Sequence, residues 1–111
     1  MGPVAAEISG GSKIFKFYSG GIIDDMALME QGVDAKSDLV CSAGKVNHAV
    51  LIVGWGIEDN GDEYFMIKNS FGTDWGENGY AKISTKASRR LPLGSCNILS
   101  SVLAPWFQEM E

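Results

Sequence analysis

His48 is the only histidine of the chain, and a candidate partner for it, Asn69, follows in the run Asn-Ser-Phe-Gly. Histidine changes charge near neutral pH and therefore suits general acid–base chemistry. An amide oxygen can accept a hydrogen bond from one imidazole N–H and so fix its tautomer and orientation, as the third member of a catalytic triad does. The pair suggests part of an active site, although a histidine without context is more often a surface residue. No nucleophile accompanies it.

A β-hairpin could bring the two residues together. Residues 48–57 form a long β-prone run, residues 63–69 alternate as a return strand, and Asn60-Gly61 between them is a strong hairpin signal. His48 lies 12 residues before Asn60, whereas Asn69 lies 8 residues after Gly61. A bulge or a wider loop is therefore needed to place both residues at the same end of the hairpin.

The remaining pattern predicts a mainly β fold, an antiparallel half-barrel of about four to six strands with short helical segments. The expected elements are strands at 3–9, 79–84 and 97–104, a helical turn at 24–32, a polar loop at 33–47, a glycine-containing loop at 70–79 and a frayed tail at 105–111.

Composition bounds the function. The chain has 111 residues, enough for one domain, and 45% hydrophobic residues, which is typical of a globular protein. A net charge of −5 with scattered basic residues argues against a nucleic-acid partner. No apolar run approaches the ~18 residues of a membrane span. No signal peptide is visible, and Met1 before Gly-Pro-Val suggests a start residue added to a segment of a longer chain.

The chain has two cysteines, Cys41 and Cys96. A bridge between them would close a loop of more than 50 residues, which is worth roughly 4 kcal/mol in the chain-entropy model. Composition alone leaves this bridge and two free buried thiols about equally open.

Several motifs, in order, resemble the C-terminal, right-hand β-barrel domain of papain-family (cathepsin-like) cysteine peptidases. They are Gly2-Pro3-Val4, Phe17-Tyr18-Ser19-Gly20-Gly21-Ile22, Asn47-His48-Ala49-Val50, the run from Lys68 to Tyr80 with Asn69-Ser70-Phe71-Gly72 and Trp75-Gly76-Glu77-Asn78-Gly79, and Gly94-Ser95-Cys96. The match spans nearly the whole chain, with residues 1–104 as the domain and 105–111 as a tail.

The resemblance implies peptide-bond hydrolysis by a thiolate–imidazolium pair, with no cofactor or metal. His48 would be the general acid–base and Asn69 its orienting partner. The substrate-binding candidates are Val46, Asn47, Ala49, Glu7, Phe71 and Trp75, with Trp75 as a wall of the leaving-group side. Glu7 would favour a basic substrate side chain if it points into the neighbouring pocket, and would be ordinary surface if it points outward.

The resemblance also implies a Cys41–Cys96 disulfide and a lysosomal or secreted location. The nucleophilic cysteine and the oxyanion-hole glutamine would belong to an N-terminal domain missing from this chain. We therefore expect that domain and a peptide substrate as partners, and no cleavage by this chain alone. Self-association through the exposed domain interface is a further expectation.

Two features depart from the family pattern. Phe71 stands where the family usually has tryptophan, which predicts weaker shielding of the His48–Asn69 hydrogen bond. Residues 24–40 are longer than in compact relatives, which indicates either a tolerated insertion or, less often, a regulatory loop near the cleft.

Two alternatives stay open. The chain could be a non-catalytic binding protein, or an inactive paralogue, on the same half-fold. Alternatively, Cys41 could itself be the nucleophile within this chain, which requires that it be free of any disulfide.

Overall fold

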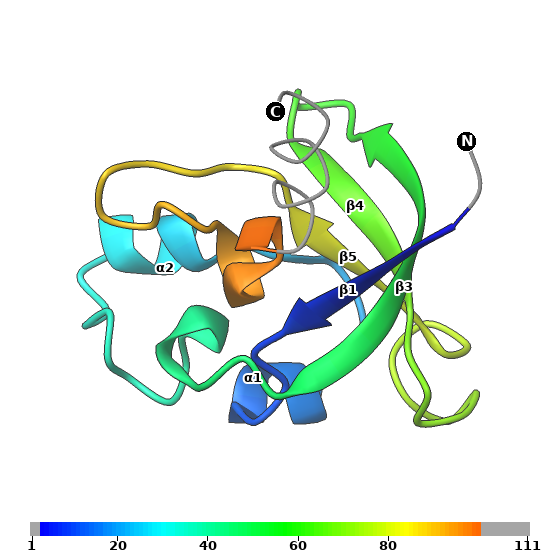
Figure 1. Ribbon diagram of the computed structural model, residues 1–111. Coiled ribbons are helices and arrows are strands. Elements are labelled where there is room, and N and C mark those ends of the chain that lie inside the picture. The colour runs from blue at the N-terminus through cyan, green and yellow to red at the C-terminus, as the bar shows by residue number, and fades with distance from the viewer. Residues whose placement is uncertain (1–2, 101–111) are drawn as a thin grey trace, which may run out of the picture.

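A five-stranded sheet organises the chain, in a computed structural model that describes residues 3–100. Its strands are β1 (Val4–Ile8), β2 (Ile22–Ile23), β3 (His48–Ile57), β4 (Glu63–Lys68) and β5 (Tyr80–Ser84). The strand order is β1-β3-β4-β5-β2, antiparallel except for the short parallel pair β2–β5. The sheet twists strongly but remains open, with the short β1 paired along the first half of the long, curved β3 (Figure 1). The expected mainly β half-barrel is confirmed.

The β3–β4 hairpin holds the expected bulge. Leu51 pairs with Lys68 and Ile52 with Ile67, but Gly54 rather than Val53 pairs with Met66. The extra residue at Val53 absorbs the unequal arm lengths. As a result, the start of β3 and the end of β4 lie side by side.

Short helices flank the sheet. Ser12 caps α1 (Lys13–Lys16) by accepting a hydrogen bond from the Phe15 N–H. Asp24 caps α2 (Asp25–Glu30) in the same way from the Ala27 N–H. The helical turn expected at 24–32 is therefore present. The loop that follows contains a 3₁₀ turn, η1 (Cys41–Ala43).

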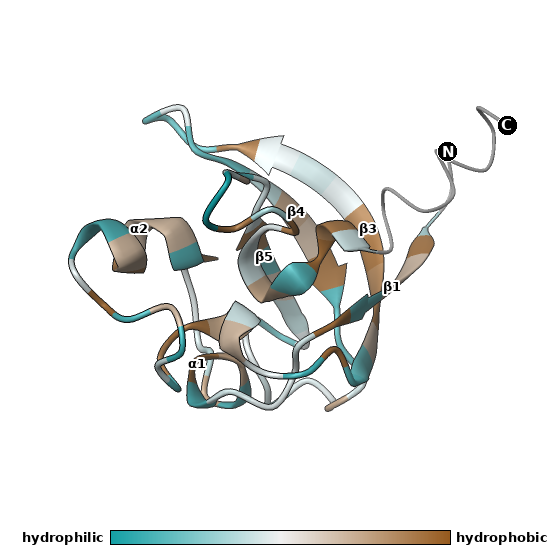
Figure 2. Ribbon diagram, turned by 60° about the vertical axis from the view of Figure 1, so that its left-hand side comes forward, coloured by the Kyte–Doolittle hydropathy of each residue, from teal (hydrophilic) through white to brown (hydrophobic). Residues whose placement is uncertain are grey.

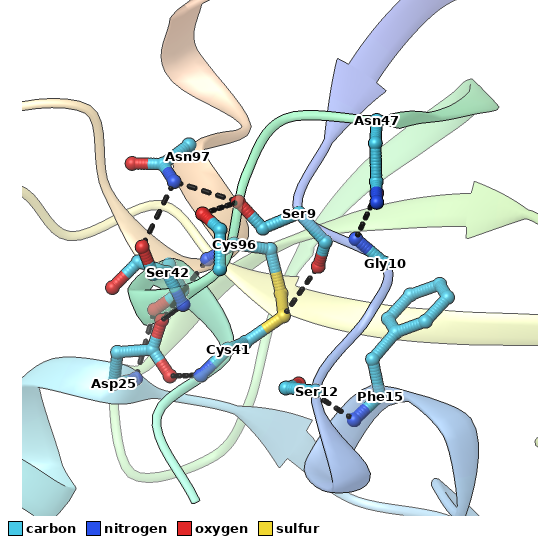
Figure 3. The surroundings of a disulfide bond; sticks show 12 residues. Ser9, Gly10, Ser12, Phe15, Asp25, Cys41, Ser42, Asn47, Cys96 and Asn97 are labelled. Atoms are coloured by element: carbon cyan, nitrogen blue, oxygen red, sulfur yellow. Dashed lines mark hydrogen bonds between the residues drawn. A yellow bond between two sulfur atoms is a disulfide. The ribbon is translucent and has the colours of Figure 1, made fainter. Parts of the chain in front are cut away.

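A disulfide joins η1 to a second 3₁₀ turn, η2 (Ser95–Asn97), through Cys41 and Cys96, whose Cα atoms are 4.6 Å apart. The buried Asp25 carboxylate accepts hydrogen bonds from the backbone N–H groups of Cys41 at 2.8 Å, Ser42 at 2.8 Å and Cys96 at 3.0 Å (Figure 3). The start of α2 and both cysteine segments are thus tied at one point.

The main core lies on the face of the sheet that these turns cover. It includes Ile8, Phe15, Val50, Ile67, Ile83 and Ile98, all buried. Hydrophobic segments, shown in brown in Figure 2, follow β1 and the first half of β3, whereas α2 is of mixed hydropathy. The sheet and η2 therefore share one core, and α1 contributes Phe15 to it.

One expected element is wrong in its described part. Residues 97–100 are not a strand, because Asn97 ends η2 and Leu99 and Ser100 are helical. Cys96 and Asn97 have φ of 56° and 58°, a left-handed conformation that a strand does not contain. The rest of the predicted strand and the 105–111 tail lie outside the described residues.

Among residues 3–100, no helix has both the length and the apolar character that crossing a membrane requires.

Candidate active site

His48 and Asn69 meet at one end of the hairpin. The His48 Nε2 and Asn69 Oδ1 atoms are 2.6 Å apart. His48 opens β3, where it pairs with Ile8, and Asn69 follows the last residue of β4. The Asn69 side chain is held in the interior, with 6% exposure, whereas the imidazole is partly exposed. A buried amide therefore faces an accessible ring.

Ser70 determines which amide atom faces the ring. Its backbone N–H donates to Asn69 Oδ1 at 2.8 Å, and the opposite amide orientation would set two donors against each other. Because Oδ1 only accepts, the His48 Nε2 must carry the proton in this contact. The neutral imidazole is thus held as the Nε2–H tautomer, which leaves Nδ1 as its basic nitrogen.

Aromatic rings enclose the imidazole. The Phe71 ring lies 4.9 Å from it between centroids, and the Phe15 ring approaches edge-on at 5.6 Å. Phe15 is fully buried, whereas Phe71 is 48% exposed. The buried Phe15 is therefore a fixed neighbour of the imidazole, whereas the half-exposed Phe71 has room to move.

Trp75 packs against both the Phe15 and the Phe71 rings. Its indole lies 4.9 Å from Phe15 and 5.9 Å from Phe71, and its Nε1–H donates to the Phe15 carbonyl at 2.9 Å. With 8% exposure, Trp75 offers little surface to a cleft. It links the 70–79 loop to α1.

The 70–79 loop is held close against Tyr18. A Cβ at Gly76, whose φ is +61°, would come within 2.6 Å of the Tyr80 carbonyl oxygen and 3.1 Å of the Tyr18 ring. Gly76 is thus required both for its conformation and for this close approach.

Tyr18 itself is held by a hydrogen bond. The Tyr18 hydroxyl donates to the Gly21 carbonyl at 2.6 Å. Burial raises the pKa of Tyr18 above its usual value.

The other candidate residues surround His48 on the surface. Val46, Asn47 and Ala49 are all exposed and lie within two residues of it in the chain. Glu7 pairs with Ala49 across β1 and β3, and both are exposed on the same face. Directly opposed Cβ atoms in such a pair lie about 5 Å apart. A carboxylate therefore stands beside a small residue on the exposed face of the β1–β3 pair, one register position away from the Ile8–His48 pair.

Both cysteines of the chain are in the disulfide, so the chain in this form contains no free thiol. The implied disulfide is confirmed. A bridged Cys41 cannot attack a carbonyl group, so its use as nucleophile would require reduction. The site therefore contains an oriented imidazole with no free thiol beside it.

Sequence reasoning missed two contributors to the site: the Ser70 N–H and Phe15. The Ser12 cap and the neighbouring aromatic run could have suggested that Phe15 is held by a helix, but only the fold brings it to His48. The role of Ser70 is a backbone one, which its side chain does not reveal.

The chain thus combines an imidazole oriented by an asparagine, at one edge of an open sheet, with a disulfide between the two 3₁₀ turns η1 and η2. The pattern of the papain family cysteine proteases matches residues 1–106, and the chain belongs to that family. It is 39% identical over 98 residues to cathepsin J of Rattus norvegicus, covering 86% of this chain and 25% of that protein. Over 87 residues it is 34% identical to cathepsin L2 of Homo sapiens, covering 76% of this chain and 22% of that protein.

Solved structures agree with the fold. Bromelain from Ananas comosus, in complex with the E64 inhibitor, matches with a TM-score of 0.65 and 28% identity, over 87% of this chain and 37% of that one. A Carica candamarcensis cysteine protease in complex with E-64 matches with a TM-score of 0.61 and 34% identity, over 88% and 36%. The chain thus spans about a quarter of the curated relatives and over a third of these two structures.

Proposed function

We propose that this chain supplies the histidine half of a cysteine peptidase active site, with His48 as general acid–base and Asn69 as its positioning residue. The observation that carries the proposal is the 2.6 Å contact between His48 Nε2 and Asn69 Oδ1, with the oxygen identified by the Ser70 N–H. This contact leaves Nδ1 to exchange a proton with a thiol.

The thiol comes from an N-terminal domain of the same kind of protease. Nδ1 takes its proton, and the thiolate attacks the peptide carbonyl carbon. The resulting imidazolium returns the proton to the leaving amine, and an acyl thioester remains on the cysteine. Nδ1 then accepts a proton from the water that attacks the thioester, and returns it to the thiol as the carboxylic acid leaves. His48 alternates between base and acid, and Asn69 holds it throughout.

Glu7, Ala49, Val46 and Asn47 form the substrate-contacting surface in this proposal. Glu7 and Ala49 are opposed in the β1–β3 register and exposed. A carboxylate beside a small residue favours an extended cationic side chain, so the preferred peptides carry arginine or lysine close to the scissile bond. Trp75, which packs against Phe71, forms a wall on the leaving-group side of the site.

The alternative function is peptide binding without cleavage, on the same half-fold. The absence of a free thiol in the oxidised chain favours it. In either case the disulfide suits an oxidising compartment, and we propose a lysosomal or secreted location.

Labelling distinguishes the two functions. A peptide carrying a thiol-reactive group is added to the chain together with the N-terminal domain of a relative, and covalent labelling of that domain's cysteine is followed. Labelling that requires His48, and is lost in His48→Ala, supports the catalytic function. Labelling that is unaffected by His48→Ala contradicts it.

A further inference from the structure

We propose that Gly10 is a positioning residue for His48. Gly10 is buried in the connection between β1 and α1. A Cβ placed on it would lie 2.6 Å from His48 Cβ, 2.8 Å from Cγ and 3.1 Å from Cδ2. The backbone of Gly10 therefore occupies the space against which the imidazole rests, and any larger residue would collide with the base of that side chain.

The requirement is for space and not for conformation. Gly10 does not have the left-handed φ found at Gly21, Gly76 and five other glycines of the described chain. Its backbone is therefore one that alanine can adopt. What alanine cannot do is place a methyl group where His48 Cβ and Cγ already lie.

Neither side of this contact is free to retreat. His48 Cβ is held by β3, in which His48 pairs with Ile8. On the other side, the Ser9 N–H donates to the Cys96 carbonyl at 2.9 Å, and the Gly10 N–H donates to Asn47 Oδ1 at 3.4 Å (Figure 3). The Asn47 N–H in turn donates to the Ile8 carbonyl at 3.1 Å. The disulfide and the β1–β3 pairing thus anchor both backbones.

An added methyl group would therefore press on the whole His48 side chain, from Cβ to Cδ2, and tilt the imidazole ring with it. Phe15 is fully buried on one side of it, whereas Phe71 is half exposed. A methyl group at Gly10 would displace the ring, and the half-exposed Phe71 is the neighbour that can yield to it. The shift would lengthen the contact from Nε2 to Asn69 Oδ1. The neutral ring could then also carry its proton on Nδ1.

The test uses nuclear magnetic resonance on the whole chain labelled with ¹⁵N, in which the single histidine gives unambiguous ring signals. Gly11→Ala is the matched control, because Gly11 is exposed and its Cβ would meet only Asn47 Nδ2, at 3.9 Å. In the unsubstituted chain and in Gly11→Ala, we expect the neutral ring to be the Nε2–H tautomer. In Gly10→Ala we expect a mixture that includes the Nδ1–H tautomer. The same tautomer in all three chains would overturn the proposal.

Two further measurements decide the matter if Gly10→Ala folds poorly. In the unsubstituted chain, nuclear Overhauser effects should connect the Gly10 Hα protons to the His48 Hβ and Hδ2 protons, and their absence would overturn the proposal. In urea unfolding, Gly10→Ala should lower the midpoint in the parent chain but not in a His48→Gly background. An equal loss in both would also overturn it.

The relevance of Gly10 to catalysis rests on the proposed function, but these measurements need no nucleophile. Failure of the chain to complement an N-terminal domain would contradict the peptidase proposal and leave the Gly10 result intact. An unchanged tautomer in Gly10→Ala would overturn the role of Gly10 without affecting that proposal.

Discussion

At the scale of single residues, the His48–Asn69 contact depends on groups that do no chemistry. The Ser70 N–H orients the Asn69 amide. Phe71 covers the imidazole from one side, and Phe15 contacts it from another. Each acts by restricting the ring, and an imidazole restricted in this way presents Nδ1 in one direction, as proton transfer in a defined geometry requires.

Removing the Asn69 amide should free the ring. With Asn69→Ala we expect the peptidase activity of the complemented chain to fall about 100-fold, because misplacing a catalytic group by around 1 Å has an effect of that order. The tautomer of His48 should become mixed at the same time. Asn60→Ala, which removes an exposed amide at the far turn of the hairpin, is the control and should retain activity. Full activity of Asn69→Ala would contradict the positioning role.

The Glu7 carboxylate should govern substrate choice. With Glu7→Gln we expect the preference for an arginine-containing over a leucine-containing dipeptide to fall about fivefold, since an exposed ion pair contributes up to roughly 1 kcal/mol. The comparison uses kcat/KM for both substrates with the complemented chain. Asp38→Asn, an exposed carboxylate in the 33–47 loop, is the charge-matched control. An unchanged preference in Glu7→Gln would show that the carboxylate does not contact substrate.

At the scale of elements, Asp25 joins α2 to both cysteine segments. Its carboxylate accepts three backbone hydrogen bonds in the interior. The 24–40 segment therefore contributes more than an exposed loop, since its first buried residue, Asp25, ties the disulfide region together. Whether the remainder of this segment acts at the cleft stays a prediction.

Asp25→Asn should destabilise the chain even with the disulfide intact. An amide replaces one accepting oxygen by a donor that faces backbone N–H groups, so we expect a loss of about 2–4 kcal/mol in the free energy of unfolding. Urea unfolding under oxidising conditions measures it, with Asp38→Asn as the surface control. A loss as small as that of the control would show that the three backbone hydrogen bonds to the Asp25 carboxylate contribute little to stability.

The buried Tyr18 should make the folded chain less stable at alkaline pH. Burial raises its pKa, so the folded chain holds the phenolic proton more tightly than the unfolded chain, and stability is lost as pH rises through the folded pKa. Between about pH 8 and about pH 11, on either side of the usual tyrosine pKa of about 10, the urea midpoint should fall more in the parent chain than in Tyr18→Phe. Equal falls would contradict this assignment.

Pattern predicted some of these elements and not others. The 48–57 and 63–69 runs with Asn60-Gly61 predicted the hairpin, and their unequal arms predicted a bulge, because strand alternation and turn chemistry are local. Residues 97–104 were expected to form a strand, but in the described part, residues 97–100, a disulfide, left-handed residues and the Leu99 N–H bond to the Leu93 carbonyl impose a turn. The hydrogen bonds to the Asp25 carboxylate could not be predicted either, since their three backbone donors come from segments distant in sequence.

At the scale of the whole molecule, an apolar surface remains on the long strand β3. Leu51, Val53, Trp55 and Ile57 are all exposed, Trp55 to 61%. A set of large apolar side chains on one strand is typical of an interface. The chain spans about a quarter of its curated relatives, so a further domain is the first proposed occupant and a second copy of the chain is the other.

We predict that the chain alone self-associates through this surface. Replacing Leu51 and Trp55 together by lysine should lower the apparent mass in light scattering, because like charges oppose contact between two copies. Replacing the exposed Phe17, which lies on α1's C-terminal side, by lysine is the control and should leave the mass unchanged. A parent chain that is monomeric across a wide concentration range would contradict the prediction.

The central claim is that His48 is the base of a site completed by another domain. The most direct test is cleavage of a fluorogenic dipeptide at mildly acidic pH with mild reductant, first by the chain alone and then with the N-terminal domain of a relative. We predict activity only after the domain is added, and its loss in His48→Ala. Cleavage by the chain alone, cleavage that survives His48→Ala, or no cleavage by a folded and bound complex would contradict the claim.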